Sequence, residues 1–474
     1  MKIKLLSLFL FIANYLSINN CFAQSIEAGG RHSLAVCNDN TARAWGFNSS
    51  GELGNGNNTS SNVPVQVSSL LGILAIAGGS EHSLALKNDG NVWAWGRNVE
   101  GPLGNGTNIS SNVPVQASNL SDVISIAAGA AHSLALKNDS TVWAWGANFS
   151  GELGNGNTTN SNIPVQVSSI SGIIAITAGG AHSLALKNDG TVWAWGNNGV
   201  GQLGNGNNTN SNVPVQVSSL ASIIAITAGN SHSLALKNDG TVWAWGGNVY
   251  GQLGNGNNTN SNVAVQVTSL SGVSSIAGGF NHSLAQKNDG TARAWGYNAN
   301  GQLGTGNTTD SNLPLQVSNI SGVIALAGGI THSLALKNDG TLQAWGWNQY
   351  GQLGNGNNNS SNVPMQVTGL CPVLNGVNEI TEQLSVSVYP NPFFTQTTLQ
   401  TDILLHNATL TVYNCFGQVV KQIKNISGKE ITLHRDNLPS GLYFIRLTPS
   451  PSGSPPYQGG DSEGVTGKLV ITDN

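Results

Sequence analysis

Along most of this chain, short apolar runs alternate with turns rich in Gly and Asn. Within residues 174–219 the runs fall at positions 174–177, 182–187, 191–195 and 214–217. The third run alternates Val, Trp, Ala and Trp, which is typical of a half-buried strand. Asn188-Asp189-Gly190 predicts a two-residue hairpin loop before it. Pro214 is expected to open the fourth strand, where a missing N–H is tolerated. The pattern predicts four short strands and no helix.

This unit repeats every 50 residues. The motif Gly-x-x-His-Ser-Leu-Ala recurs seven times without insertion or deletion, with its His at positions 32, 82, 132, 182, 232, 282 and 332. Repeats of this length indicate a propeller, a solenoid or an array. Four strands per copy and seven copies predict an all-β fold built around a seven-bladed β-propeller.

The chain begins with a pattern typical of a secretory signal. Lys2 and Lys4 supply positive charge, residues 5–16 are mostly apolar, and Cys21-Phe22-Ala23 offers small residues for cleavage. The apolar stretch is too short to span a bilayer, and no other segment is long and apolar enough to do so. We therefore predict a signal peptide over residues 1–23, export through the periplasm, and no transmembrane segment in the mature chain.

The repeat resembles that of the regulator of chromosome condensation family. The resemblance rests on His-Ser-Leu-Ala-Leu-Lys-Asn-Asp-Gly-Thr-Val-Trp-Ala-Trp-Gly followed by Gly-Gln-Leu-Gly-Asn-Gly, and it covers residues 24–370. It implies a seven-bladed propeller. Founding members exchange nucleotide on a nuclear GTPase through segments that protrude from the propeller. No copy here carries an insertion and the chain has an export signal, so we do not expect that activity. Among exported bacterial relatives the resemblance implies binding proteins, including a protein inhibitor of β-lactamases.

Residues 386–474 lack the repeat and read as strands separated by Gly, Pro and Asn turns, which predicts a small C-terminal antiparallel β-sandwich. Their motifs resemble the C-terminal sorting domain of the type IX secretion system of Bacteroidetes. The motif residues are Pro390, Asn391, Pro392, Gly417, Gly441, Tyr443, Gly467 and Lys468. The resemblance implies recognition by the type IX secretion machinery, followed by removal of the domain or surface attachment. We therefore expect a secreted or outer cell-surface protein.

These segments divide the chain into four parts: a signal peptide over 1–23, a propeller over 24–370, a linker over 371–385 and a sorting domain over 386–474. Only 8% of the 474 residues are charged, against about 25% in ordinary soluble domains. The net charge is −4 with 18 basic residues. Binding to nucleic-acid phosphates needs clustered Lys and Arg, so we expect no nucleic-acid partner.

The repeated polar residues point to architecture and not to catalysis. The seven His stand on seven blades and cannot converge on one metal ion, whose ligands must lie about 2 Å from it. Each His follows a Gly turn, and we expect it to hydrogen-bond to that turn. The chain shows no nucleophile elbow, no phosphate-binding loop and no unique Ser, His and Asp set. We expect no enzyme activity, no cofactor and no metal.

The informative positions are those where the copies differ, after each Trp-Gly and in the two residues before each His. In a four-stranded meander, both connections emerge on one face of the disc. Aromatic residues at these positions define what we term the aromatic face: Phe47, Phe149, Tyr250, Phe280, Tyr297, Trp347 and Tyr350. Clustered exposed aromatics mark binding sites. The alternative is that each ring packs over its own blade. The opposite face carries a repeated Lys beside each hairpin Asp and is expected to be solvated.

Three cysteines remain after removal of the signal. Cys37 replaces the repeated Lys at the end of a strand in the first copy, and Cys371 lies just past the last strand of the seventh. The first and seventh copies must meet to close the ring, so a disulfide between Cys37 and Cys371 is one prediction. Two buried free thiols are the alternative. Cys415 has no assigned partner.

Together these features predict a non-enzymatic binding or adhesion module at the cell surface, recognising an unknown protein or glycan through the aromatic face. Two alternatives stay open. One is a secreted protein inhibitor of another protein. The other is a polysaccharide-acting enzyme, which would need His, Tyr or carboxylate groups unique to one blade and facing a groove; the sequence shows none.

Overall fold

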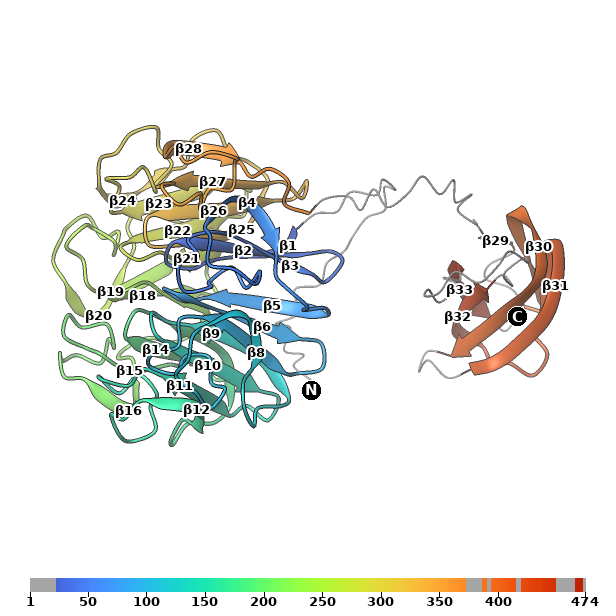
Figure 1. The fold of residues 1–474 in the computed structure, drawn as a ribbon, viewed down its shortest axis with the longest axis horizontal. Helices are drawn as coiled ribbons and strands as arrows, with labels where there is room; N and C mark the ends of the chain where they lie inside the picture. The colour runs from blue at the N-terminus through green and yellow to red at the C-terminus, as the bar shows by residue number, and fades with distance from the viewer. Residues whose placement is uncertain (1–22, 372–385, 390–393, 415–418, 449–464, 472–474) are drawn as a thin grey trace. The chain divides into compact units, whose positions relative to one another are not determined.

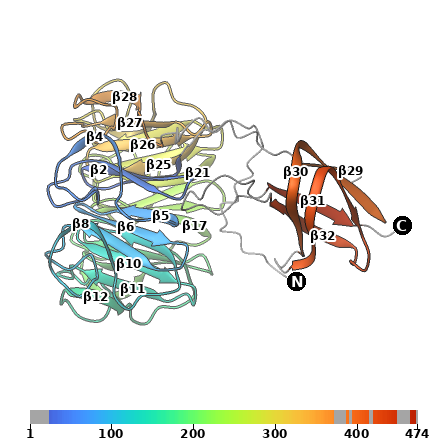
Figure 2. The same ribbon diagram turned by 45° about the vertical axis from the view of Figure 1, so that its right-hand side comes forward.

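A computed structural model describes residues 23–371, 386–389, 394–414, 419–448 and 465–471. The chain divides into two compact units, Met1–Val373 and Leu374–Asn474, and each is described by itself (Figures 1 and 2). Apart from Ala23 and Cys371, the predicted signal peptide and linker lie outside the described residues. The described residues contain strands and no helix, which confirms the all-β fold class.

The first unit consists of seven four-stranded antiparallel sheets, the blades. Blades one and two comprise β1 (Ala23–Ala28), β2 (His32–Cys37), β3 (Ala42–Gly46), β4 (Ser61–Gln66), β5 (Ile73–Gly78), β6 (His82–Lys87), β7 (Val92–Gly96) and β8 (Ser111–Gln116). Blades three and four comprise β9 (Val123–Ala128), β10 (His132–Lys137), β11 (Val142–Gly146), β12 (Ser161–Gln166), β13 (Ile173–Ala178), β14 (His182–Lys187), β15 (Val192–Gly196) and β16 (Ser211–Gln216).

Blades five to seven follow the same order. They comprise β17 (Ile223–Ala228), β18 (His232–Lys237), β19 (Val242–Gly246), β20 (Ser261–Gln266), β21 (Val273–Gly278), β22 (His282–Lys287), β23 (Ala292–Gly296), β24 (Ser311–Gln316), β25 (Val323–Gly328), β26 (His332–Lys337), β27 (Leu342–Gly346) and β28 (Ser361–Gln366). Each blade is built from four consecutive strands. Strand β1 also contacts β25 and β26, so the first and seventh blades close the ring, and the predicted seven-bladed propeller is confirmed.

Two local expectations were wrong. The hairpin between β14 and β15 has a three-residue loop, because the N–H of Gly190 donates to the carbonyl of Lys187 and the N–H of Lys187 donates to the carbonyl of Thr191, each at 2.9 Å. Only the last loop residue, Gly190, has a positive φ, of 79°, as in a type I turn with a Gly bulge. Pro214 lies inside β16, where the register shifts between Ala194 and Gly196. An outermost strand tolerates it there, since no neighbour needs its N–H.

Neighbouring blades are joined by one arrangement of polar groups, illustrated by blades one and two. The carbonyl oxygen of Glu52 accepts the indole N–H of Trp95 at 2.7 Å and the hydroxyl of Ser83 at 2.9 Å. Trp95 is fully buried. Its ring lies against Gly54, where an added Cβ would come within 2.8 Å of the indole. Gly54 also has a φ of +62°, so both space and backbone conformation require Gly there.

The imidazole of each repeated His reaches the Ser of the next blade. The seven pairs are His32–Ser83, His82–Ser133, His132–Ser183, His182–Ser233, His232–Ser283, His282–Ser333 and His332–Ser33, all at 2.9–3.0 Å between Nε2 and Oγ. The expectation that each His side chain bonds to its own Gly turn was therefore wrong. The main chain holds that turn instead: the N–H of Gly29 donates to the carbonyl of His32 at 2.9 Å.

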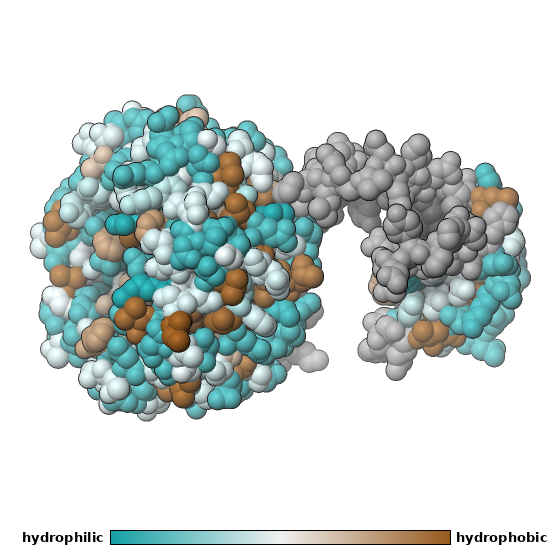
Figure 3. Space-filling model, viewed as in Figure 1, coloured by the Kyte–Doolittle hydropathy of each residue, from teal (hydrophilic) through white to brown (hydrophobic). Residues whose placement is uncertain are grey.

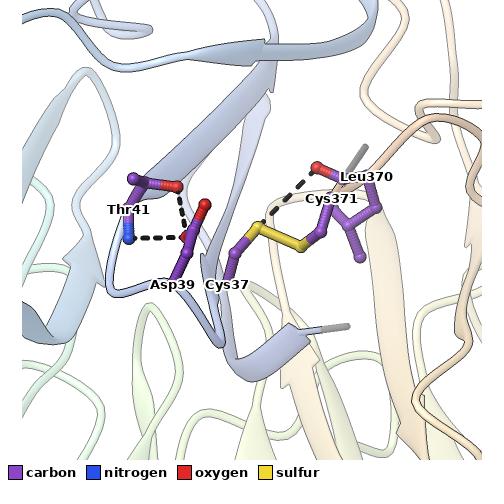
Figure 4. Close-up of a disulfide and its surroundings, with 5 residues drawn as sticks. All are labelled: Cys37, Asp39, Thr41, Leu370 and Cys371. Carbon is purple, nitrogen blue, oxygen red and sulfur yellow. Dashed lines mark hydrogen bonds between the residues drawn. A yellow bond between two sulfur atoms is a disulfide. The ribbon is translucent and has the colours of Figure 1, made fainter. Parts of the chain in front are cut away.

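A disulfide joins Cys37 at the end of β2 to Cys371, which follows the last propeller strand (Figure 4). The two Cα atoms lie 5.9 Å apart across a sequence separation of 334. The Sγ of Cys37 also lies 3.8 Å from the carbonyl oxygen of Leu370, a van der Waals contact, because a bonded sulfur has no proton to donate. Since no strand is exchanged between the first and seventh blades, this bond is the covalent link at the closure.

The second unit is a single five-stranded antiparallel sheet of β29 (Val386–Tyr389), β30 (Gln396–Asn414), β31 (Val419–His434), β32 (Gly441–Thr448) and β33 (Val465–Ile471). The long strand β30 pairs with β31 along one edge and with β29 and then β32 along the other. Strands β29 and β33 approach each other although they are last in the strand order at opposite ends. The sheet therefore curls over its own core, which includes Leu399, Leu410 and Leu433.

Replacing Ser183 by Ala should lower the free energy of unfolding of the propeller by about 1–3 kcal/mol. The change leaves the buried Nε2–H of His132 without its acceptor, and an unsatisfied buried donor costs about that much. Urea denaturation followed by Trp fluorescence measures the effect selectively, since all 12 Trp lie between residues 45 and 347. Ser171→Ala, at an exposed position of the same blade, is the control and should change the value by under about 0.5 kcal/mol. Equal losses in both variants would contradict this role for Ser183.

Breaking the Cys37–Cys371 bond should destabilise the propeller. In the chain-entropy model a closed loop of 334 residues contributes up to about 6 kcal/mol, as an upper bound. Thermal unfolding of the full chain should therefore begin at a clearly lower temperature in the Cys37→Ser/Cys371→Ser double variant. Thiol labelling of the denatured wild-type chain should gain two labels after reduction. An unchanged label count would show that the bond does not form.

Candidate functional site

The two loops that carry the variable residues are tied together in every blade. The N–H of Phe47, just after β3, donates to the carbonyl of Arg31, just before β2, at 2.9 Å. The same bond joins Trp347 to Thr331 at 2.8 Å. Residues from the β1–β2 turn and from the β3–β4 loop therefore lie side by side on one end of the propeller.

A buried Asn fixes the long loop beneath these residues. Asn48 is fully buried. Its side-chain amide donates to the carbonyls of Asn57 and Thr59, and its oxygen accepts the N–H of Leu53 at 2.8 Å. The equivalent residues are fully buried in all seven blades: Asn48, Asn98, Asn148, Asn198, Asn248, Asn298 and Asn348. Each Gly- and Asn-rich loop is therefore a folded support for the residue that it presents.

A second polar residue positions the backbone at the loop tip. In the first blade the buried carboxylate of Glu52 accepts the N–H of Ser50 at 2.9 Å, and burial raises its pKa to about 7. In the fifth and seventh blades, Gln252 and Gln352 accept the N–H groups of Tyr250 and Tyr350 in the same way, at 3.0 and 3.1 Å. Either side chain supplies the acceptor, and Gln does so without a buried charge.

Four residues meet where the first and seventh blades close the ring, and we term them the seam cluster: Arg31, Phe47, Trp347 and Tyr350. The rings of Phe47 and Tyr350 are 4.7 Å apart at 61°, and those of Trp347 and Tyr350 are 5.4 Å apart at 85°. The Arg31 guanidinium carbon lies 5.7–6.0 Å from the centres of all three rings. The three rings are half-buried, while Arg31 is exposed.

The other predicted aromatics are placed differently. Tyr250 and Tyr297 contact each other between blades five and six, at 4.7 Å and 57°. Phe280 lines the central channel. Phe149 is 71% exposed on blade three, across the ring from the seam. The structure therefore brings five of the seven aromatics into two clusters that bridge neighbouring blades, and leaves Phe149 apart.

The central channel contains a residue that the sequence reasoning missed. Its volume is about 350 Å³, and it is lined by the innermost strand of each blade. Glu27 is the one ionisable residue among these lining residues. Its side chain is exposed to the channel, and desolvation by the surrounding walls raises its pKa to about 7. The other copies place only Ala or Thr at this position: Ala77, Ala127, Thr177, Thr227, Ala277 and Ala327. A comparison of the seven copies could have revealed Glu27 from the sequence alone. The expectation that no carboxylate unique to one blade faces a groove was therefore wrong.

The His side chains of the seven His–Ser pairs have a defined protonation state. The hydroxyl of Ser83 donates to the carbonyl of Glu52, so its oxygen must accept the Nε2–H of His32. Each imidazole is therefore neutral, with its proton on Nε2 and an unprotonated Nδ1. Burial lowers the pKa of His132 to about 4 and that of His82 to about 3. These His side chains join neighbouring blades of the propeller and are poorly suited to proton transfer near neutral pH.

Other described groups offer no further chemistry. Among them, no cluster of three or more His, Cys, Asp or Glu could hold a metal ion. On the hairpin face, Lys87 pairs with Asp89 at 3.0 Å and Lys337 with Asp339 at 2.8 Å. The surface seen in Figure 3 mixes hydrophilic residues with separate apolar ones, so hydropathy alone does not mark a site. The residues that the structure covers include no helix that could span a membrane.

The sorting-motif residues fall partly in the curled sheet. Tyr443 is buried in β32, and its hydroxyl donates to the carbonyl of Pro439 at 2.8 Å. Gly441 pairs with Ile471, and Lys468 in β33 pairs with Phe444. Gly467 also lies in β33. Pro390, Asn391, Pro392 and Gly417 lie outside the described residues.

Two family models match the chain. The RCC1-like domain matches residues 13–320 and 173–388, and the secretion system C-terminal sorting domain matches residues 387–452. No curated protein matches the sequence of this chain. Among solved structures, human WBSCR16 is similar, with 26% identity over 67% of this chain and 87% of its own and a TM-score of 0.61. Prp20p from Saccharomyces cerevisiae has 24% identity over 78% and 90%, with a TM-score of 0.63, and supports the fold alone.

The propeller should lose stability as the pH falls below about 6.5. A His with a folded-state pKa of about 3 to 4 stays neutral while the unfolded chain takes up a proton, so each contributes stability that is present above pH 6.5 and lost toward pH 4. The loss is up to about 1.4 kcal/mol per pH unit for each His. Urea denaturation at pH 7 and pH 5, followed by Trp fluorescence, measures it.

The raised pKa of Glu52 acts in the opposite direction, because its contribution is lost as the pH rises through 7. Glu52→Gln copies the residue of four other blades and removes this opposing effect, so the loss between pH 7 and pH 5 should become steeper in that variant. If the wild type has the same free energy of unfolding at both pH values, the buried His side chains are not held neutral in the folded state.

Proposed function

We propose that this chain, which belongs to the RCC1-like domain family, is an exported binding protein that holds a protein or glycan on its aromatic face without catalysing a reaction. The sorting domain directs export by type IX secretion to the cell surface or the extracellular space. The propeller is then the part of the chain available to meet a ligand there.

The seam cluster is the observation that carries this proposal. The seven blades share their internal bonds, and none of the other six junctions combines an aromatic pair with a basic residue: Trp347, Tyr350 and Phe47 surround Arg31 only where blades seven and one meet. Rings packed edge to face keep part of their surface exposed, and aromatic and Arg side chains dominate the energy of binding surfaces. The rings also pack between blades, so they serve the fold as well as the proposed surface.

The channel favours a non-enzymatic role over a polysaccharide-acting enzyme. Glycosidic cleavage by the common route needs two carboxyl groups on either side of the bond, about 5–9.5 Å apart. Glu27 is the one carboxylate among the residues that line the channel. The buried His imidazoles donate their Nε2 protons to Ser hydroxyls and face no open groove. The residues that line the channel therefore contain no such pair of carboxyl groups.

Alanine at Tyr297, Trp347 and Tyr350 together should abolish or weaken ligand binding at least tenfold, because these half-buried rings belong to the two aromatic clusters of the face. Screening the full chain on a glycan array and against cell-surface proteins identifies the ligand class, and binding of the triple variant is then compared with the wild type. Leu71→Ala is the control, since it removes an exposed apolar side chain beside the hairpin loop between β6 and β7, away from the aromatic face. A folded triple variant that binds every ligand as the wild type does would reject the proposal.

A further inference from the structure

Arg31 is the basic centre of the seam cluster, and closure of the propeller brings Trp347 and Tyr350 to it. Arg31 and Phe47 come from blade one, whereas Trp347 and Tyr350 come from blade seven, about 300 residues later in the chain. The guanidinium carbon is 5.7 Å from the Trp347 ring centre and 5.9 Å from that of Phe47. At these distances the rings attract the cation and hold it in place.

Arg31 has no carboxylate partner among the described residues, although it is exposed. The second basic residue of this face, Arg97 in blade two, is different: it bonds Glu100 through two nitrogens, one of them at 3.0 Å, and lies 3.4 Å from Glu81. The other blades carry no cation where blade one has Arg31; the equivalents are Glu81, Ala131, Ala181, Ser231, Asn281 and Thr331. Among the described residues, the face therefore presents one guanidinium, that of Arg31, which pairs with no carboxylate.

The geometry of the rings selects the kind of ligand. Phe47 and Trp347 both pack against Tyr350 at steep angles, and the guanidinium of Arg31 occupies space over all three rings. Each of the three rings thus already has the guanidinium and at least one other ring as a neighbour, which leaves less flat aromatic surface for a sugar ring to stack on. The planar fork of N–H donors on Arg31 instead suits a carboxylate, which it can bind through two parallel hydrogen bonds.

An apolar residue lies beside the backbone that carries this cation. Ile330, whose N–H donates to the carbonyl of Gly30 at 3.0 Å, stands beside the residue before Arg31. It lines the channel together with Phe280. A ligand with a carboxylate adjacent to an apolar group would use both features. Acidic protein segments have this composition, whereas oligosaccharide acids carry hydroxyl groups in place of the apolar part.

We propose that the seam cluster binds an acidic protein segment, with an Asp or Glu carboxylate on Arg31 and a neighbouring apolar side chain toward Ile330. This inference rests on the proposed binding function and names the partner chemistry of the same face. The carboxylate would form charge-assisted bonds with Arg31, while the rings around them exclude water and strengthen those bonds.

The test uses the full chain and an array of immobilised hexapeptides, each with one central Glu or Asp flanked by Leu, Phe or Tyr. Matched peptides carry Gln or Asn at the centre, and trigalacturonic acid represents an acidic glycan. We expect acidic peptides to bind at least tenfold more tightly than their amide counterparts. Arg31→Gln should remove that preference, and Arg31→Lys should keep part of it. Lys337→Gln, which alters a paired cation on the opposite face, should change binding less than twofold.

The outcomes separate this inference from the proposed function. Equal binding of acidic and amide peptides, absence of any peptide binding, or binding of trigalacturonic acid alone would each overturn the acidic-segment proposal. If the Tyr297, Trp347 and Tyr350 triple variant loses a ligand that Arg31→Gln retains, the aromatic face binds but Arg31 does not select its partner. Trp-fluorescence melting of Arg31→Gln, expected within about 2 °C of the wild type because the side chain is exposed, shows that the variant is folded.

Discussion

The propeller depends on one carbonyl oxygen per blade that accepts two hydrogen bonds from the next blade. In the first blade this is the oxygen of Glu52, which receives the indole N–H of Trp95 and the hydroxyl of Ser83. Ser83 in turn accepts the Nε2–H of His32, which belongs to the same blade as Glu52. These hydrogen bonds therefore lead from His32 in blade one to Ser83 in blade two and return to the carbonyl of Glu52 in blade one. Each hydrogen bond in such a chain polarises and strengthens the next, so loss of one group weakens the remaining bonds.

The same arrangement closes the ring. The carbonyl of Gln352 in the seventh blade accepts the indole of Trp45 at 2.9 Å and the hydroxyl of Ser33 at 2.8 Å, and Ser33 accepts from His332 at 3.0 Å. The closing junction is thus chemically equivalent to the other six, although it joins the two ends of the propeller. Separation of the chain ends would break these bonds together, and the Cys37–Cys371 disulfide opposes that separation.

The strands within each copy could be predicted from the sequence, whereas the hydrogen bonds between neighbouring blades could not. Strand number, blade number and the fold class followed from the 50-residue period, because each strand is a local pattern. The partner of His82 did not follow, since Ser133 lies 51 residues away on the next blade. Pro214 was placed at a strand start because a register shift in β16 has no sequence signature. Glu27 could have been found, as the one carboxylate at a position that is otherwise Ala or Thr.

The division between shared and variable residues also explains why a binding site would form at the seam. At position 47 and its equivalents the backbone N–H makes the same loop bond in every blade, while the side chain differs between copies, so that side chain can change without breaking the repeated polar junction. At six junctions the neighbouring blades are consecutive copies in the sequence. At the seventh, the first copy supplies Arg31 and Phe47 and the last supplies Trp347 and Tyr350. Because the closing bonds fix these two copies as firmly as any other pair, residues from the two ends of the repeat array form a preorganised surface, which lowers the entropy cost of binding a partner.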